Sequence, residues 1–197
     1  VAGTSIKPEY DKYGTNRSVY RRDTTISYNA NGGTGTTTST VVKQYYNSGY
    51  GNTAGTANNG ANVSTPSFTL ATNNFTKTGY NFSKWADGSA SGTQYAAGAT
   101  YTGFTPAVDS ADTTKTMYAI WSEKTAKLTY NANGHGTAPS EVTMKYTTAT
   151  NAASAITATN YTFNGWNTKA DGTGTSYAAG AQVKAANTIP NAMTLYA

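Results

Sequence analysis

The sequence carries the same series of short motifs twice, in the same order. Tyr-Asn-Ala-Asn-Gly occurs at 28–32 and 130–134, and an aromatic motif that ends in Trp occurs at 79–85 and 160–166. Tyr-Ala-Ala-Gly-Ala then occurs at 95–99 and 177–181, and a Met/Leu-Tyr-Ala motif at 117–119 and 195–197. A series repeated in order indicates repeated structural modules. We expect an N-terminal arm at 1–24, one module at 25–122 and a second at 127–197.

The composition raises the question of how these modules build a core. Only 21 of the 197 residues are Leu, Ile, Val or Phe, which is a fraction typical of disordered chains. The net charge of +5 is mild, however, and 16 Tyr and three Trp supply apolar area by other means. We therefore expect two small aromatic cores, each only moderately stable alone.

The residue types favour a mainly β fold with a minor α component. Thr and Tyr favour strands, whereas Asn and Gly favour turns. Strands are expected at 25–28, 38–46 and 116–121 in the first module, and at 127–130, 141–146 and 193–197 in the second. Each Asn-Gly pair predicts a tight turn with positive φ. The Ala-rich stretch 147–159 predicts a short helix.

Aromatic residues at matching places in both copies are the expected core. In 80–85 and 161–166 they alternate as in a strand with one buried face. A sugar-stacking platform is the alternative, and we favour a core because other apolar residues are scarce. The predicted core residues are Tyr28, Tyr80, Phe82, Trp85, Tyr118, Trp121, Tyr130, Tyr161, Phe163, Trp166 and Tyr196.

Taken together, these motifs resemble the Listeria–Bacteroides repeat, also called the internalin B-type repeat. The resemblance implies small β-grasp-like modules in tandem on secreted or surface-anchored microbial proteins, with roles as stalk, spacer, adhesin or assembly unit and without catalysis. The first copy departs from the pattern at Lys84 and Met117, where Gly and Leu are usual. The second stops at Ala197, before the x-Trp that closes the first copy as Ile120-Trp121.

The differences between the copies suggest where partners bind. An Asn- and Gly-rich insertion at 47–66 has no counterpart of that length in the second copy, and it is either a partner-binding loop or a tolerated insertion. The arm holds all three Arg of the chain. It is either a solvated linker or an assembly element, with Arg17, Tyr20, Arg21 and Arg22 as candidate contacts.

An additional segment at one end and a shortened module at the other suggest head-to-tail assembly. Either the natural chain continues past 197, or another chain supplies the missing contact by strand addition. A head-to-tail contact that does not close into a ring builds a filament. The expected partners are therefore copies of the chain or neighbouring surface repeats.

Reactive groups are scarce. The chain has no Cys and one His, His135, which we expect to be a turn residue because no partner is placed beside it in the sequence. Asp109 and Asp112 do not match a calcium-loop pattern well. No cofactor, metal or nucleic acid is expected, and no apolar run reaches the roughly 20 residues of a membrane span.

The sequence thus predicts a non-enzymatic extracellular structural protein of a microbe, part of a stalk, adhesin or polymerised filament. The alternative is an adhesive module that recognises a host protein or a glycan.

Overall fold

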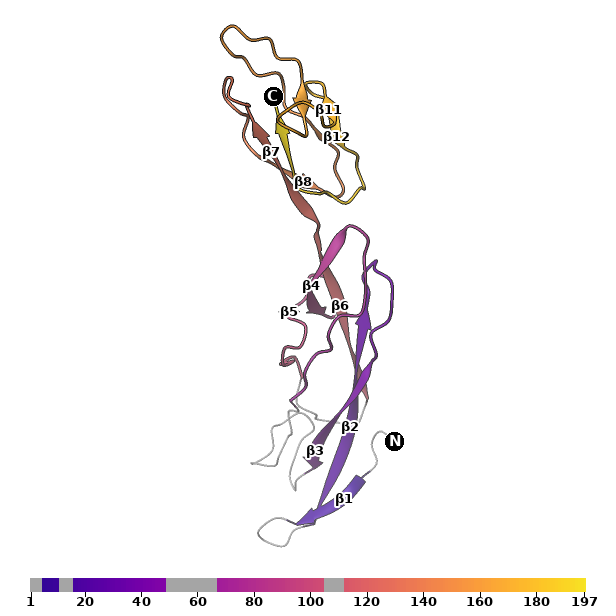
Figure 1. The fold of residues 1–197 in the computed structure, drawn as a ribbon. Helices are drawn as coiled ribbons and strands as arrows, with labels where there is room; N and C mark the ends of the chain where they lie inside the picture. The colour runs from indigo at the N-terminus through magenta and orange to yellow at the C-terminus, as the bar shows by residue number, and fades with distance from the viewer. Residues whose placement is uncertain (1–4, 11–15, 49–66, 105–111) are drawn as a thin grey trace. The chain divides into compact units, whose positions relative to one another are not determined.

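A computed structural model describes residues 5–10, 16–48, 67–104 and 112–197, with side chains described from residue 23 to 44 and in the last two ranges (Figure 1). The chain divides into two compact units. Unit 1 comprises Val1–Lys77 and Phe82–Trp121, and unit 2 comprises Thr78–Asn81 and Ser122–Ala197. Every regular element in the described ranges is a strand, which confirms the mainly β prediction.

The first repeat forms a six-stranded sheet. Its central strand, β2 (Asn16–Asn29), pairs antiparallel with β1 (Ser5–Tyr10) and β3 (Thr40–Ser48), and parallel with β6 (Thr113–Glu123). Beyond β6 follow β4 (Tyr80–Asp87) and β5 (Gln94–Tyr95). The strand expected at 25–28 therefore begins nine residues earlier, and much of the predicted arm is β1 and the first half of β2.

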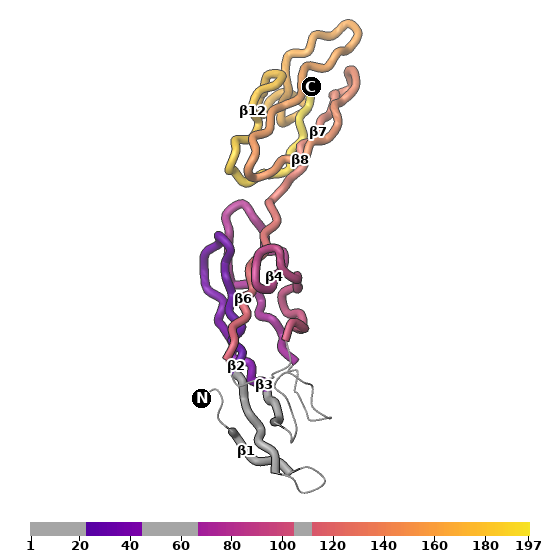
Figure 2. Tube along the Cα trace, turned by 180° about the vertical axis from the view of Figure 1, so that it is seen from behind, coloured from indigo at the N-terminus to yellow at the C-terminus, as the bar shows by residue number. Residues whose placement is uncertain are grey.

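The second repeat builds a smaller sheet on the same plan. Figure 2 traces the chain through this repeat, from β7 and β8 to the C-terminus. Its hairpin, β7 (Thr125–Asn131) and β8 (Val142–Lys145), matches β2 and β3. The last strand, β13 (Met193–Tyr196), lies parallel to β7 as β6 lies parallel to β2. The short strands β10 (Trp166–Asn167) and β11 (Ser176–Tyr177) complete the sheet, and β9 (Thr150–Asn151) pairs with β12 (Gln182–Lys184).

The Asn-Gly turns have the predicted backbone geometry. Asn31 and Gly32 have φ of 47° and 81°, and Asn133 and Gly134 have φ of 55° and 86°. Asn and Gly tolerate this left-handed region better than other residues do. In both turns, an Asn side chain two residues earlier accepts a hydrogen bond from the backbone N–H of the turn Asn at 2.8 Å.

The core of unit 1 centres on Trp85, which is fully buried. Its indole Nε1 donates a hydrogen bond to the backbone oxygen of Ala71 at 2.9 Å. The backbone N–H of the same alanine donates to the hydroxyl of Tyr28 at 2.8 Å. The two rings lie 4.7 Å apart, between centroids, at 56°. One indole and one phenol thus satisfy both backbone polar groups of one residue, an arrangement we call the clamp.

Unit 2 contains the same clamp. Trp166 donates to the oxygen of Ala153 at 2.9 Å, and the N–H of Ala153 donates to the Tyr130 hydroxyl at 2.9 Å. The rings lie 4.9 Å apart at 59°. Burial raises the pKa of Tyr130, as it does for the equivalent Tyr28, so the hydroxyl stays neutral at physiological pH.

Four of the expected core residues lie outside both apolar clusters. Because side chains alternate across a strand, the fully buried Met117 and Leu195 place the adjacent Tyr118 and Tyr196 on the opposite face, where both are only half-buried. Tyr80 is also half-buried, and its ring meets that of Tyr146 within unit 2, at 5.8 Å and 67°. The fourth, Tyr161, is 61% exposed, so its assignment to the core is wrong.

The predicted helix at 147–159 is also wrong. Part of this stretch is β9, and the N–H of Ala152 donates to the oxygen of Ala181 at 2.8 Å. Ala152 is buried, so the Ala-rich stretch packs its small side chains against the core. Contacts distant in sequence therefore override local helix propensity here.

The buried Lys184 helps to hold this non-helical path. Its ammonium donates to three backbone oxygens, those of Tyr146 at 3.1 Å, Thr148 at 2.9 Å and Ala185 at 2.7 Å. A buried ammonium is costly unless its donors are satisfied, and here three acceptors converge on it.

We predict that Tyr130→Phe lowers the free energy of unfolding of unit 2 by about 1–3 kcal/mol, because the Ala153 N–H loses its acceptor inside the core. Chemical denaturation followed by the near-ultraviolet signal measures the change. Tyr161→Phe is the matched control, since it removes an exposed hydroxyl and should leave the midpoint unchanged. Equal effects of the two substitutions would contradict the importance of the clamp.

A second prediction concerns acid stability. The Glu123 carboxylate accepts hydrogen bonds from the Thr147 hydroxyl at 2.5 Å and its backbone N–H at 2.6 Å, and these lower its pKa below the ordinary 4.5. A lowered folded-state pKa contributes stability above the unfolded-state pKa, and this stability is lost as the pH falls through the folded-state pKa. Glu123→Gln should therefore destabilise unit 2 at pH 7 and flatten its loss of stability on acidification. Denaturation at a series of pH values tests this, with Glu141→Gln as the surface control.

Candidate functional site

The described residues contain no cluster suited to hold a metal ion, defined as three or more His, Cys, Asp or Glu side chains together. His135 lies exposed in the turn after β7, and its ring stacks on Tyr161 with centroids 3.9 Å apart at 28°. Of the two acids considered for calcium, Asp109 lies outside the described residues. Asp112 accepts a hydrogen bond from the N–H of Asp23 at 2.9 Å.

One carboxylate is tied to a buried hydroxyl that sequence reasoning missed. The Tyr101 hydroxyl donates to Oδ2 of Asp87 at 2.6 Å, and Tyr101 is 2% exposed. Burial is the largest cause that raises the pKa of Tyr101 above its ordinary value, and the carboxylate adds to it. The phenol is therefore a fixed donor that anchors the end of β4. The second repeat has Val183 at the equivalent position, so this pair is not a duplicated site.

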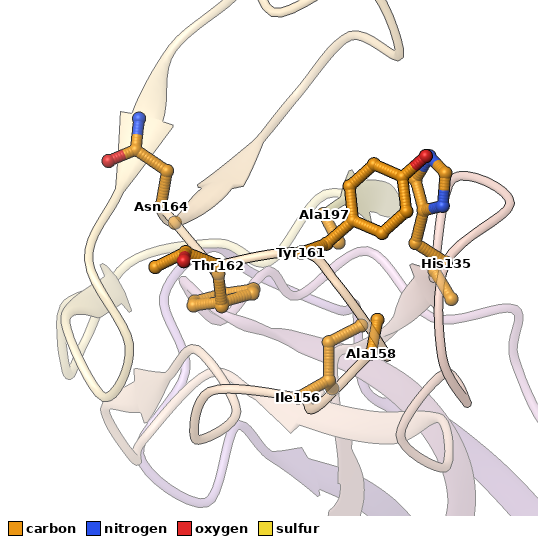
Figure 3. Close-up of a pocket in the computed structure, with 10 residues that line it drawn as sticks. His135, Ile156, Ala158, Tyr161, Thr162, Asn164 and Ala197 are labelled. Atoms are coloured by element: carbon orange, nitrogen blue, oxygen red, sulfur yellow. The ribbon is translucent and has the colours of Figure 1, made fainter.

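Unit 2 contains a pocket of about 160 Å³ beside the end of β13 (Figure 3). Its wall is largely apolar, and His135 and Tyr161 stand together at one side. The lining residues are Ala132, His135, Ile156, Ala158, Tyr161, Thr162, Phe163, Asn164, Gly165 and Ala197.

Tyr161 lies at this pocket because the chain leaves the sheet there. The preceding Asn160 has φ of 65°, and among the described residues Tyr161 pairs only through an isolated bridge to Ala158. The alternation that would turn its ring inward therefore does not apply. Phe163, two residues later, still packs against the core.

In unit 1 the equivalent place is filled by Trp121. Its indole Nε1 donates to the oxygen of Ala30 at 2.9 Å, and its ring meets Phe82 edge-on at 6.0 Å and 87°. Ala30 and Phe82 correspond to Ala132 and Phe163, which both line the pocket of unit 2.

The candidate assembly residues of the arm lie on one strand. The backbone of β2 contains Arg17, Tyr20, Arg21 and Arg22; Arg17 pairs with Glu9 of β1. The side chains of these four residues lie outside the described part of the chain, as do residues 49–66 of the predicted insertion. No helix among the described residues is long and apolar enough to cross a membrane.

Comparison with known proteins gives one curated relative and one family. Over 117 residues the chain is 35% identical to a protein of Evansella cellulosilytica named "Putative Gly-rich membrane protein". The match covers 54% of this chain and only 13% of that protein. No solved structure matches the chain significantly.

The family match confirms the resemblance drawn from the motifs. The Listeria-Bacteroides repeat domain matches residues 25–119 and 127–197. This domain is a non-enzymatic repeat, typical of bacterial surface proteins. Both clamps lie inside the matched ranges, and the chain belongs to the Listeria-Bacteroides repeat family, of which it contains two tandem copies.

Proposed function

We propose that the chain is a non-enzymatic, load-bearing segment of an extracellular stalk on a bacterial cell. The observation that carries this proposal is that the strand on which each repeat begins, β2 or β7, is a parallel neighbour of the strand on which it ends, β6 or β13. β2 pairs with β6 from Thr24↔Thr113 to Asn29↔Tyr118, and β7 pairs with β13 from Leu128 to Asn131.

This topology determines how a pulling force acts on each repeat. Tension enters at the start of the first strand and leaves at the end of the last, so it slides the two parallel strands along each other. All hydrogen bonds between them are then loaded together, whereas strands pulled apart from one end lose their bonds one at a time. A module tied in this way resists extension, as a stalk requires.

Hydroxyl groups add to the same strand pairs. Ser27 and Thr116 oxygens lie 3.1 Å apart between β2 and β6, and Thr129 and Thr194 oxygens lie 2.7 Å apart between β7 and β13. One residue, Lys124, separates β6 from β7, so force leaving the last strand of the first repeat passes directly to the first strand of the second.

The same features favour a structural role over catalysis. What the two repeats share is the clamp and the parallel strand pair, and both are made of groups that hold the backbone. The polar features that differ, such as the Asp87–Tyr101 pair, occur once. The name of the Evansella relative supports a location at the cell envelope.

Single-molecule pulling tests this function. Extended from its two ends, the full chain should unfold in two separate steps, one for each repeat. A His135→Cys variant held between residue 135 and the C-terminus loads β7 and β13 from the same end, and should open the second repeat at a clearly lower force. Equal forces in the two geometries would contradict the proposal.

We further propose that the arm mediates head-to-tail assembly of such stalks into filaments. β1 and the first half of β2 extend the first sheet beyond the part that pairs with β6, and three arginines lie on this extension. An extended edge of this kind suits strand addition between copies.

Imaging by negative-stain electron microscopy tests the filament proposal. The parent chain should form fibres, and the combined variant Arg17→Ala, Arg21→Ala, Arg22→Ala should not. The combined variant Lys84→Ala, Lys145→Ala, Lys169→Ala lowers the net charge equally and should assemble normally. A parent that stays monomeric, or unchanged fibres in the arginine variant, would contradict the proposal.

The alternative is an adhesive module that binds a host protein or glycan through the 47–66 insertion. Most of that segment lies outside the described residues. A pull-down that depends on the insertion would favour this alternative.

A further inference from the structure

We propose that the turn Thr78–Asn81 of the first repeat is a docking surface for the ring of Tyr146 in the second repeat, and that Gly79 is the residue that admits this ring. The inference goes beyond the proposed function, because it concerns which residues unit 2 needs in order to fold. It rests on contacts within unit 2, which includes this turn although the turn belongs to the sequence of the first repeat.

The backbone holds the turn to the rest of unit 2. The N–H of Lys124 donates to the oxygen of Gly79 at 2.9 Å, and the oxygen of Lys124 accepts a hydrogen bond from the N–H of Tyr146 at 3.1 Å. Gly79 is buried. Two consecutive hydrogen bonds therefore bring the turn next to Tyr146, which directly follows β8.

The backbone of Tyr146 is itself held by further hydrogen bonds. Its oxygen accepts from the N–H of Asn187 at 2.8 Å and from the ammonium of Lys184 at 3.1 Å. The carboxylate of Glu123 binds both the hydroxyl and the N–H of the next residue, Thr147. These bonds fix the backbone from which the ring of Tyr146 projects toward the turn.

The ring of Tyr146 lies against the α-carbon of Gly79. A Cβ built on Gly79 would overlap Cγ, Cδ1 and Cε1 of that ring. The ring of the neighbouring Tyr80 meets the same ring at 5.8 Å and 67°, a tilted geometry that aromatic pairs prefer. Glycine thus leaves the space for one tyrosine ring, and Tyr80 supplies an aromatic wall beside it.

The aromatic residue is a feature of the second repeat. The registers of the two hairpins place Gln44 of the first repeat where Tyr146 stands, two residues after the equivalent buried residues Val42 and Met144. Gln44 is buried and accepts a hydrogen bond from the Thr24 hydroxyl at 2.6 Å. The turn and the tyrosine therefore form a complementary pair that is not a repeated core contact.

The turn of the second repeat shows which sequence would prevent docking. Gly79 and Asn160 hold equivalent positions and have φ of 78° and 65°. Asn tolerates this left-handed backbone, but its Cβ would occupy the space that the ring of Tyr146 takes at Gly79. Gly at this position of the turn therefore permits docking, and Asn prevents it.

The first experiment compares Gly79→Asn with Gly88→Asn in the full chain. Gly88 is the matched control, because its φ is 74° and a Cβ built on it has no non-adjacent atom within 4 Å. Asn tolerates the backbone at both positions, so only Gly79→Asn should displace the ring. It should speed the exchange of sheet amides of unit 2, such as that of Leu128, about tenfold relative to Gly88→Asn.

The second experiment is a double-mutant cycle with Tyr146→Ala. Without the ring, the new side chain has room, so Gly79→Asn should change the exchange rate of the Leu128 amide less than about twofold. In the parent chain, which needs no substitution, the α-protons of Gly79 should show nuclear Overhauser contacts to the Tyr146 ring.

Three results would overturn the proposal. They are equal exchange of the unit 2 amides in Gly79→Asn and Gly88→Asn, an effect of Gly79→Asn that persists undiminished in the Tyr146→Ala background, and absence of the Overhauser contacts in the parent chain. None of these measurements applies force, so such a failure would leave the pulling result, and hence the load-bearing proposal, untouched.

Discussion

Each unit depends on one indole and one phenol that hold the same backbone residue from opposite sides. Ala71 and Ala153 lie outside the strands of their units. The oxygen of Ala153 also accepts a hydrogen bond from the Gly180 N–H at 3.2 Å. Trp85 and Trp166 can be buried without leaving a polar group unsatisfied, because each indole N–H donates a hydrogen bond to the alanine oxygen. The tyrosine hydroxyls accept the alanine N–H groups from the other side. A chain so poor in aliphatic residues gains from this arrangement both its apolar area and the satisfaction of its buried backbone.

The clamp also lies across the strand pair that we propose to be load-bearing. In unit 1, Tyr28 lies on β2 and Trp85 lies on β4, with β6 between these strands in the sheet order. The clamp at Ala71 therefore connects the two strands that flank β6, so that, under the proposed load, core packing and strand pairing would resist force together. At the end of this pair in unit 1, the Trp121 indole donates to the oxygen of Ala30 and packs against Phe82.

Much of the architecture could be predicted from the sequence, because aromatic residues that recur at matching places in both copies mark the core. The buried Trp85 and Trp166 stand at matching places in both copies, and local pattern was sufficient to find them. Prediction from the local pattern failed where contacts between residues distant in sequence determine the backbone conformation. The stretch 147–159 is helical by composition, but Lys184 and the β9–β12 pairing hold it otherwise. Tyr161 follows the alternation of its motif, yet a turn at the residue before it brings its ring to the surface.

If the clamp holds each core together, the alanine between its two rings should be the last part of each unit to open, and amide hydrogen exchange measures this directly. The Ala71 and Ala153 N–H groups should exchange only through complete unfolding of their own units, with free energies equal to those of global unfolding. Rapid exchange of these two amides, while the neighbouring sheet amides such as Leu128 stay protected, would contradict the account.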